Sequence, residues 1–326
     1  MSPAAASPAR HCYSIYGVRV TSEFPFEFPI ETSGAGGDAA LAHVDFVEGG
    51  DSDFQPFDLP ADADSSIVCL PLDGGPTYLR WPHWYEFSVA ADGSRVACRP
   101  LNGCDRSVLQ NFLFGQVLAV ALVQQGLEPL HASVVRLGES AVAFLGDCTF
   151  GKSTLLATFL DAGHHVVTDD VLLVDRRAGE RVALPGSGRI KLLPDSARRF
   201  RKDAEDGTPL NPLTSKRSFP VDPSKRQQRA LPLRQLFVLP DPDERDRAGS
   251  IEIRPASPAE MVRELLKNTF TDRIVSRDRL VRQFEHAAQI ASEIDGFRLS
   301  YPTGLQHLTA VREAIVDHVR RNTGEL

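Results

Sequence analysis

A run of eight residues, Gly146–Ser153, could bind the phosphates of a nucleotide. Its sequence, GDCTFGKS, fits the pattern GxxxxGK[ST] of the P-loop. The glycines Gly146 and Gly151 would let the backbone curl so that successive N–H groups point at an anion. The helix expected to start at Lys152 would direct the positive end of its dipole toward the same anion. The run therefore predicts a nucleotide site.

Two side chains of this run would act on the phosphates directly. Lys152 would reach the β- and γ-phosphates, and the Ser153 hydroxyl would bind a Mg²⁺ ion that also bridges phosphate oxygens. An apolar strand precedes the run and an apolar-faced helix follows it, which is the context a P-loop needs. The expected cofactors are ATP and Mg²⁺, and the expected nucleotide-binding residues are Gly146, Asp147, Cys148, Thr149, Phe150, Gly151, Lys152, Ser153 and Thr154.

Two adjacent acids, Asp169 and Asp170, form the second candidate feature. They end an apolar strand, where carboxylates are costly unless a cation or a proton transfer needs them. In a strand they would point to opposite faces, so one could face a metal and the other the substrate. They follow Lys152 by 17 and 18 residues, which leaves room for one helix and one crossover. The alternative is an Asp pair in a turn that only interrupts two strands.

His131 is the third candidate, at the start of the strand that leads into the P-loop strand. A single histidine is more often a packed or surface residue than a catalytic one. Its position alone therefore assigns it no role.

Basic side chains gather between residues 189 and 229, although the chain as a whole is acidic. The plain interpretation is a solvated, partly mobile surface, and the sharper one is a flexible lid or docking strip for phosphates or an acidic peptide. RNA binding lacks support because no aromatic residues are interleaved for base stacking. The basic residues are Arg189, Lys191, Arg198, Arg199, Arg201, Lys202, Lys216, Arg217, Lys225, Arg226 and Arg229.

Composition limits the class of protein. Of 326 residues, 42% are hydrophobic and 24% charged, as in ordinary globular proteins and unlike disordered, collagenous or membrane chains. The net charge of -7 argues against nucleic acid as the main partner. Five cysteines without a CxxC pair indicate neither a disulfide framework nor a structural zinc site. No secretory signal is recognised, and the most apolar run, Phe112–Val123, is too short for a membrane span. We therefore expect a cytoplasmic protein without a membrane partner.

The elements expected around these residues form an α/β fold. Residues 1–104 are expected to be a small β-rich N-terminal region, and residues 105–326 a P-loop domain with a mixed sheet and flanking helices. The domain would begin with a buried helix over residues 105–125, too apolar for a surface position. Its further elements are a hairpin over 131–145, the P-loop helix to Ala162, strands over 165–175 and 231–239, and helices over 258–269, 278–294 and 305–321.

Together these residues resemble the catalytic domain of the HPr kinase/phosphorylase family. That family has a His at a strand start, a loop of the form GDSGxGKS, a helix ending in Gly-His and a strand ending in Asp-Asp. The layout beyond this motif is similar to the shorter HPr-kinase-like proteins of lasso-peptide gene clusters, over residues 13–17, 185–195 and 231–239. The motif residues that match are His131, Gly146, Asp147, Gly151, Lys152, Ser153, Gly163, His164, Asp169 and Asp170.

The resemblance implies ATP-dependent phosphoryl transfer to a serine hydroxyl, at the C-terminal Ser of a precursor peptide. For this transfer we expect Asp169 to be the general base and Asp170 to bind Mg²⁺ with Ser153, although the sequence leaves open which of the two acids is the base. Lys152 and the loop amides would neutralise the transferred phosphoryl. His131 would lie beside Asp169, near the reacting phosphate. The resembled family is hexameric, which is compatible with a homo-oligomer here.

The sequence departs from the family pattern at several positions. Cys148-Thr149-Phe150 replaces the Ser-Gly of the loop, so that one glycine is missing, and Thr154 replaces the usual Glu. The later signature of the phosphorylase half-reaction has no match. The alternatives to a precursor-peptide kinase are a kinase for an HPr-like carrier protein, a kinase for a small metabolite, and a non-catalytic nucleotide sensor or scaffold.

Overall fold

The computed structural model describes most of the chain as two compact units. The units are Met1–Gln125 and Gly126–Leu326, and each is described by itself. The described residues are 10–26, 40–55, 57–60, 62–104, 106–211, 213–271 and 273–324. The resembling stretch at 185–195 and all the candidate site residues lie inside these ranges.

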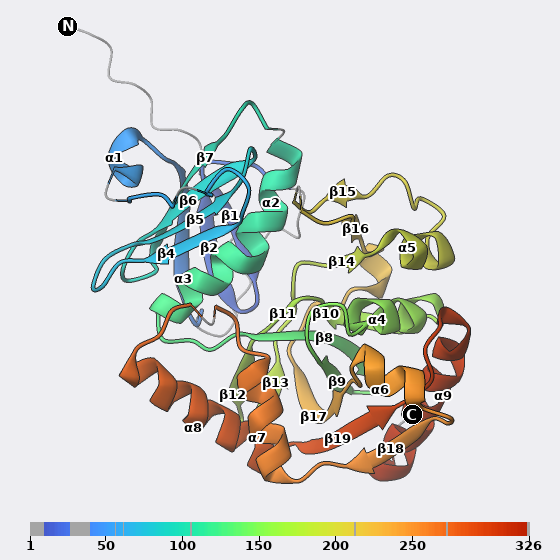
Figure 1. Cartoon of the computed structure of the whole chain (residues 1–326). Helices are drawn as coiled ribbons and strands as arrows, with labels where there is room; N and C mark the ends of the chain where they lie inside the picture. The colour runs from blue at the N-terminus through green and yellow to red at the C-terminus, as the bar shows by residue number, and fades with distance from the viewer. Residues whose placement is uncertain are drawn as a thin grey trace, which may run out of the picture. The chain divides into compact units, whose positions relative to one another are not determined.

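The first unit is built on a seven-stranded sheet in the order β1-β2-β3-β7-β6-β5-β4 (Figure 1). β3 runs parallel to β2 and β7, and the other pairs are antiparallel. Its strands are β1 (His11–Ile15), β2 (Val18–Ser22), β3 (His43–Glu48), β4 (Val68–Pro71), β5 (Thr77–Trp81), β6 (Tyr85–Val89) and β7 (Arg95–Pro100), with a short helix α1 (Asp51–Phe54).

A helical segment after β7 packs on this sheet. It comprises η1 (Arg106–Val108), α2 (Leu109–Phe112), η2 (Leu113–Val117) and α3 (Leu118–Gln124). The ring of Phe112 lies 4.8 Å from Trp81, and that of Phe114 lies 4.9 Å from Phe26. These aromatic contacts group the segment with the first unit, whereas the sequence analysis placed it in the second. No helix within the described ranges is long and apolar enough to cross a bilayer.

The second unit contains a larger mixed sheet in the order β10-β8-β9-β17-β13-β12, with β11 paired to β8, and with β19 between β17 and β18. The central strands β9, β17 and β19 are parallel to each other. The expected hairpin over 131–145 is present as β8 and β9. The strands are β8 (Leu130–Leu137), β9 (Ser140–Leu145), β10 (His165–Thr168), β11 (Val171–Leu172), β12 (Val174–Arg177), β13 (Glu180–Ala183), β17 (Leu231–Val238), β18 (Glu252–Pro255) and β19 (Asp295–Ser300).

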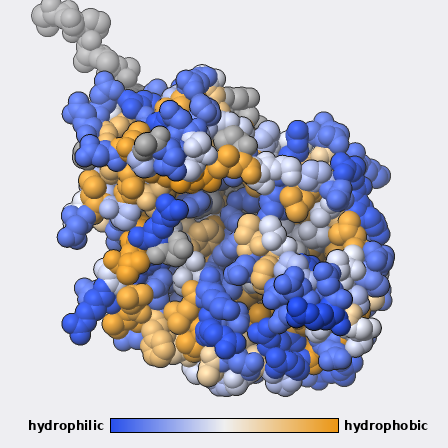
Figure 2. Space-filling model, viewed as in Figure 1, coloured by the Kyte–Doolittle hydropathy of each residue, from blue (hydrophilic) through white to orange (hydrophobic). Residues whose placement is uncertain are grey.

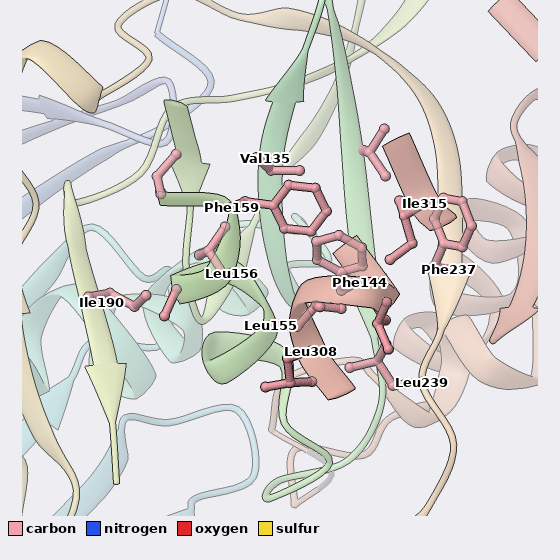
Figure 3. Packing of buried hydrophobic residues seen from close by; sticks show 14 of the residues in the cluster. Val135, Phe144, Leu155, Leu156, Phe159, Ile190, Phe237, Leu239, Leu308 and Ile315 are labelled. Carbon is pink, nitrogen blue, oxygen red and sulfur yellow. The ribbon is translucent and has the colours of Figure 1, made fainter. Parts of the chain in front are cut away.

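Helices cover both faces of this sheet. On one face, α4 (Lys152–Asp161) and α9 (Leu308–Thr323) enclose a core that includes Phe144, Phe237 and Ile315. Figure 3 shows Phe144 of β9 close to Phe159 of α4, and their stacked ring centroids are 5.5 Å apart. On the other face, α7 (Pro258–Lys267) and α8 (Arg277–Glu293) enclose a second core. Burial on both faces explains why all six residues of β9 are apolar or small.

The basic segment forms a small sheet of its own. Its strands β14 (Arg189–Leu192), β16 (Arg217–Pro220) and β15 (Thr208–Pro209) are antiparallel, and α5 (Pro194–Phe200) and η3 (Pro223–Lys225) accompany them. Ile190, Leu192 and Phe219 belong to the same core as α4. The segment is therefore anchored on α4 and is not a purely solvated surface.

Candidate active site

The turn between β9 and α4 has the curl that the sequence predicts. Gly146 has φ +149° and Gly151 has φ +91°, and Gly151 precedes the first residue of α4. A Cβ on Gly146 would meet the side chain of Phe150 at 3.1 Å. Both positions therefore favour glycine, and the helix N-terminus faces the space that the turn surrounds.

Thr149 occupies the position of the missing glycine and adopts a glycine-like backbone. Its φ is +75°. A β-branched residue in the left-handed region is a strained conformation, of the kind that gathers at ligand sites. The loop therefore has a left-handed backbone at this position without glycine, the residue that would adopt it most easily.

Lys152 lies folded over the loop. Its side chain is almost fully buried, and Nζ donates to the carbonyl oxygens of Gly146 at 2.5 Å and Asp147 at 3.1 Å. Burial lowers the pKa of Lys152, and the nearby carboxylates of Asp169 and Asp170 oppose that shift. A buried ammonium on carbonyl oxygens is well placed to exchange them for an anion that enters the loop.

Asp169 connects the P-loop helix to the sheet and to the basic segment. Its Oδ1 accepts hydrogen bonds from the hydroxyls of Ser133 at 2.5 Å and Ser153 at 2.9 Å, and its Oδ2 accepts one from the backbone N–H of Lys191 at 2.9 Å. The residue is only 3% exposed. Burial raises the pKa of Asp169, while these three hydrogen bonds act in the opposite direction.

Asp170 faces different partners. Lys191 Nζ donates to its Oδ2 at 2.5 Å, and Nε2 of His131 lies 3.4 Å from its Oδ1. Burial alone would raise the pKa of Asp170, but the Lys191 ammonium and His131 outweigh it and hold this pKa well below its ordinary value. The resemblance implied that His131 lies beside Asp169, and the ion pair of its ring in the structure is with the adjacent Asp170.

The backbone around the acid pair explains the separation of the two side chains. β10 and β11 both pair with β8, but Asp169–Asp170 interrupt them as a bend in which Asp170 has φ +82°. The Thr168 hydroxyl closes the bend by donating to the Val171 carbonyl at 2.6 Å. The expected alternation of a regular strand is therefore wrong. The bend matches the alternative of a turn. Its two carboxylates nevertheless contact side chains or backbone of α4, β8 and β14.

Three residues of this network were not singled out as site residues from the sequence. Lys191 was noted only as one of many basic residues. Ser133 is fully buried within the apolar strand β8, two positions after His131, and this placement was a usable signal. Asn268 follows α7 directly, far along the chain, and no local pattern indicated it.

Asn268 holds the loop and His131 together. Its Oδ1 accepts a hydrogen bond from the N–H of Gly146 at 3.0 Å, and its backbone carbonyl accepts one from the N–H of His131 at 2.6 Å. Its Nδ2 donates to the Glu264 carbonyl at 2.8 Å, and the residue is 2% exposed. The end of α7 thereby fixes the first residue of the loop relative to β8.

A cation and a phenol lie at the other side of the loop. Arg245 belongs to α6 (Pro242–Arg247), which follows β17, and Tyr301 follows β19. A Cβ on Gly151 would lie 3.3 Å from Arg245 Nη1 and 3.8 Å from the Tyr301 hydroxyl. The Arg245 guanidinium lies 5.7 Å from the centre of the Tyr301 ring. In the described part of the chain, this buried hydroxyl makes no hydrogen bond.

The remaining expected nucleotide-binding residues have mixed surroundings. Asp147 and Cys148 are exposed, and Phe150 packs on the core that contains α4. The Thr154 hydroxyl lies 3.0 Å from the Ser196 hydroxyl of α5. The backbone of these residues shapes the loop, while Phe150 and Thr154 also anchor it.

The oxygen donors at the loop fit Mg²⁺. The Ser153 hydroxyl and the carboxylates of Asp169 and Asp170 are hard oxygen ligands, which Mg²⁺ prefers, and Mg²⁺ is usually held by one or two carboxylates together with substrate phosphates. Within the described ranges, no cluster of three or more His, Cys, Asp or Glu side chains could hold a metal by itself. The donor set therefore suits an ion whose coordination is completed by a nucleotide.

Comparisons with known proteins identify no family for this chain. No family model matches the chain, and no curated protein matches it. Among solved structures, the chain is similar to the Hpr(Ser) kinase/phosphatase from Coxiella burnetii, with a TM-score of 0.34 and 14% sequence identity, over 60% of this chain and 93% of that chain. A TM-score this low does not establish a shared fold.

Proposed function

We propose that this chain is an ATP-dependent kinase that transfers the γ-phosphoryl group to a serine hydroxyl of a peptide. The observation that carries the proposal is the 2.9 Å hydrogen bond from Ser153 of the loop to Asp169, with a second acid, Asp170, beside it. Phosphoryl transfer depends on positioning and on electrostatic stabilisation more than on covalent chemistry. A curled loop, a lysine, a hydroxyl and two carboxylates in one place can provide both.

The loop would bind the β- and γ-phosphates. Its backbone N–H groups and the N-terminus of α4 supply a positive field, and Lys152 would exchange the carbonyls of Gly146 and Asp147 for phosphate oxygens. Ser153 and Asp169 would hold Mg²⁺, which when bound neutralises phosphate charge. Burial lowers the pKa of Lys152. The negative charge of the entering phosphates would raise this pKa again and so favour the charged ammonium.

Arg245 and Tyr301 would contact the nucleoside side of ATP. Strands β17 and β19 run parallel to β9, and ligands of open α/β sheets bind beyond the carboxyl ends of such strands. Both residues follow those ends and lie next to Gly151. A planar guanidinium and a buried, unpaired hydroxyl suit a sugar, an α-phosphate or a base.

We divide the roles of the two acids by their contacts. Asp169 accepts three hydrogen bonds and would fix Ser153 and the metal side of the site. Asp170, whose side chain is 21% exposed, is accessible to the serine hydroxyl of the substrate and lies beside His131. We therefore assign Asp170 as the proton acceptor, which is the reverse of the assignment expected from the sequence. A general base must first lie within hydrogen-bond reach of the proton that it accepts, and its pKa is the second criterion.

The transfer step is a displacement at the γ-phosphorus. The serine oxygen forms a bond to this phosphorus, and the bond from phosphorus to the bridging oxygen of the β-phosphate breaks, so that ADP leaves. The hydroxyl proton passes to the Asp170 carboxylate, and His131 orients that carboxylate. Lys152 neutralises charge on the transferred oxygens.

The acceptor class is supported by the sequence resemblance. Residues 13–17, 185–195 and 231–239 resemble the lasso-peptide group of HPr-kinase-like proteins, which act on the C-terminal serine of a precursor peptide. We therefore propose a precursor peptide that ends in serine as the acceptor. An HPr-like carrier protein and a small metabolite are the other acceptors that the same chemistry would serve.

Mass spectrometry tests this function. The protein, ATP and Mg²⁺ are incubated with the peptide encoded by a neighbouring gene, and in parallel with the same peptide carrying Ala at its last position. The expected result is one phosphate on the serine peptide and none on the Ala peptide. Nucleotide binding without transfer to any peptide, carrier protein or metabolite would favour a sensor and contradict the proposal.

A further inference from the structure

A pocket of about 360 Å³ adjoins the loop of the candidate active site. It lies between the end of β14, α5, β15 and residues 214–217, and its lining includes Leu192, Arg198, Lys216 and Arg217. Figure 2 shows mostly hydrophilic residues on the surface over α5 and β15. The pocket belongs to the basic segment, and apolar side chains such as Leu192 and Ala197 share its lining with the cations.

One contact connects the pocket lining to the phosphate loop directly, because Lys216 Nζ lies 3.9 Å from the Cys148 Sγ of the loop. In addition, α5, which forms one wall, is joined to α4 by the contact between the hydroxyls of Ser196 and Thr154. A molecule in this pocket would therefore lie beside the loop.

The charge of the lining is positive. Three cations, Arg198, Lys216 and Arg217, line it against one acid, Glu205. Arg217 donates hydrogen bonds to the backbone carbonyls of Glu205 and Gly207. Arg198 forms a surface ion pair with the exposed Asp195. Lys216 makes no ion pair with any described acid. An uncompensated ammonium at a concave site attracts an anion.

The nucleotide is not the occupant that this geometry favours. The nucleoside side of ATP is placed near Arg245 and Tyr301, beyond β17 and β19. The pocket instead adjoins β14, whose Lys191 contacts Asp170. An in-line displacement requires the acceptor to approach the γ-phosphorus opposite the leaving group. An acceptor whose serine reaches the γ-phosphorus at the loop could extend its neighbouring groups to Lys216, which contacts Cys148 of that loop.

On the basis of the proposed function, we propose that this pocket binds a carboxylate of the acceptor peptide and that Lys216 is its main cationic contact. The carboxylate would come from the peptide C-terminus, next to the reacting serine, or from an acidic side chain near that serine. Lys216 contacts Cys148 of the loop, so it would position the acceptor against the site without taking part in the proton transfer. It is thus a specificity residue for acidic peptides.

Peptide kinetics and binding with charge variants test this inference. Three forms of one fluorescein-labelled peptide that ends in serine are compared: the free acid, the C-terminal amide, and the free acid with its acidic side chains replaced by amides. The variants are Lys216→Gln, Lys216→Glu and Arg198→Gln, and Lys202→Gln is the control because this exposed lysine does not line the pocket. Thermal unfolding checks that each variant folds.

The expected result is a KM for the free acid that rises about tenfold in Lys216→Gln and further in Lys216→Glu, with the KM for ATP unchanged. The peptide form that lost the relevant carboxylate would bind wild type weakly and be insensitive to Lys216→Gln, which identifies the source of the carboxylate. An unchanged peptide KM in both Lys216 variants, or a rise in the KM for ATP instead, would overturn the inference.

Fluorescence anisotropy separates this outcome from failure of the proposed function. Peptide binding is measured with a non-hydrolysable ATP analogue and Mg²⁺, so no turnover is needed. Absence of transfer by wild type would reject the kinase, whereas binding of all three peptides with equal affinity by wild type and Lys216→Glu would reject the pocket.

Discussion

The Ser153 hydroxyl donates its hydrogen bond to Asp169 and not to the adjacent Asp170. Because Ser153 is the residue expected to bind Mg²⁺, this contact places Asp169 on the metal side of the site. Asp170 is left with His131 and Lys191. Adjacent acids with separate partners can perform separate tasks, and substitution can distinguish them.

Asp170→Asn and Asp169→Asn should fail in different ways. Asp170→Asn should lower kcat on the order of 10²–10⁴-fold with little change in the KM for ATP, because it removes the proton acceptor. Asp169→Asn should raise the Mg²⁺ concentration needed for half-maximal rate, because the site loses the negative charge of a carboxylate ligand. Steady-state rates across a Mg²⁺ titration make this comparison. The reverse pattern would restore the assignment in which Asp169 is the base.

The sequence predicted the features that have local signals. The loop Gly146–Ser153, the hairpin before it and the helices of the second unit follow from glycine spacing and hydrophobic periodicity. Asn268 and Lys191 could not be predicted as site residues because their contacts join positions distant in the chain. The helical segment before Gln125 was expected at the start of the second domain, whereas it belongs to the unit that ends at Gln125. A segment that is apolar all round does not indicate which sheet it packs on.

Thr149→Gly should stabilise the protein. Glycine accepts φ +75° without the clash of a Cβ, so the free energy of unfolding should rise by up to about 1 kcal/mol, the lost strain exceeding the added chain entropy. Urea unfolding gives this value. Thr149→Ala is the matched control because it keeps a Cβ, and equal stability of the Gly and Ala variants would show that the loop is unstrained.

Asn268→Ala should weaken nucleotide binding. It leaves the Gly146 N–H without its acceptor, which costs about 1–3 kcal/mol in a buried position and loosens the start of the loop. The KM for ATP should rise by about tenfold or more. Lys267→Ala, one residue earlier and exposed, controls for disturbance of the helix end. A variant that melts earlier but keeps the wild-type KM for ATP would assign Asn268 a purely structural role.

Arg245→Ala should weaken binding of ATP but not of inorganic triphosphate. The guanidinium lies beside Gly151 on the nucleoside side, so only a ligand with a nucleoside should lose its contact, with an affinity loss of about tenfold for ATP. Isothermal titration calorimetry measures both ligands, and Arg247→Ala on the same helix is the control. Equal loss for both ligands would instead place Arg245 on the phosphates.

The stability contributed by Asp170 should depend on pH. The pKa of Asp170 in the folded protein lies below the ordinary value of 3.8, so the ionised form is favoured by folding. This stabilisation is complete above about pH 5 and is lost as the pH falls through 3.8 toward the folded value. The difference in unfolding free energy between wild type and Asp170→Asn should therefore shrink at low pH. A difference that stays constant from pH 7 to pH 3 would contradict this coupling.

Transfer of label from γ-³²P-ATP to the serine peptide, by wild type and by Lys152→Ala under single-turnover conditions, tests the kinase most directly. We expect label on the peptide with wild type in the presence of Mg²⁺, and none with Lys152→Ala, because the buried ammonium no longer neutralises the transferred group. Label that remains in ATP with wild type, or moves to the peptide equally well with Lys152→Ala, would contradict the proposed function.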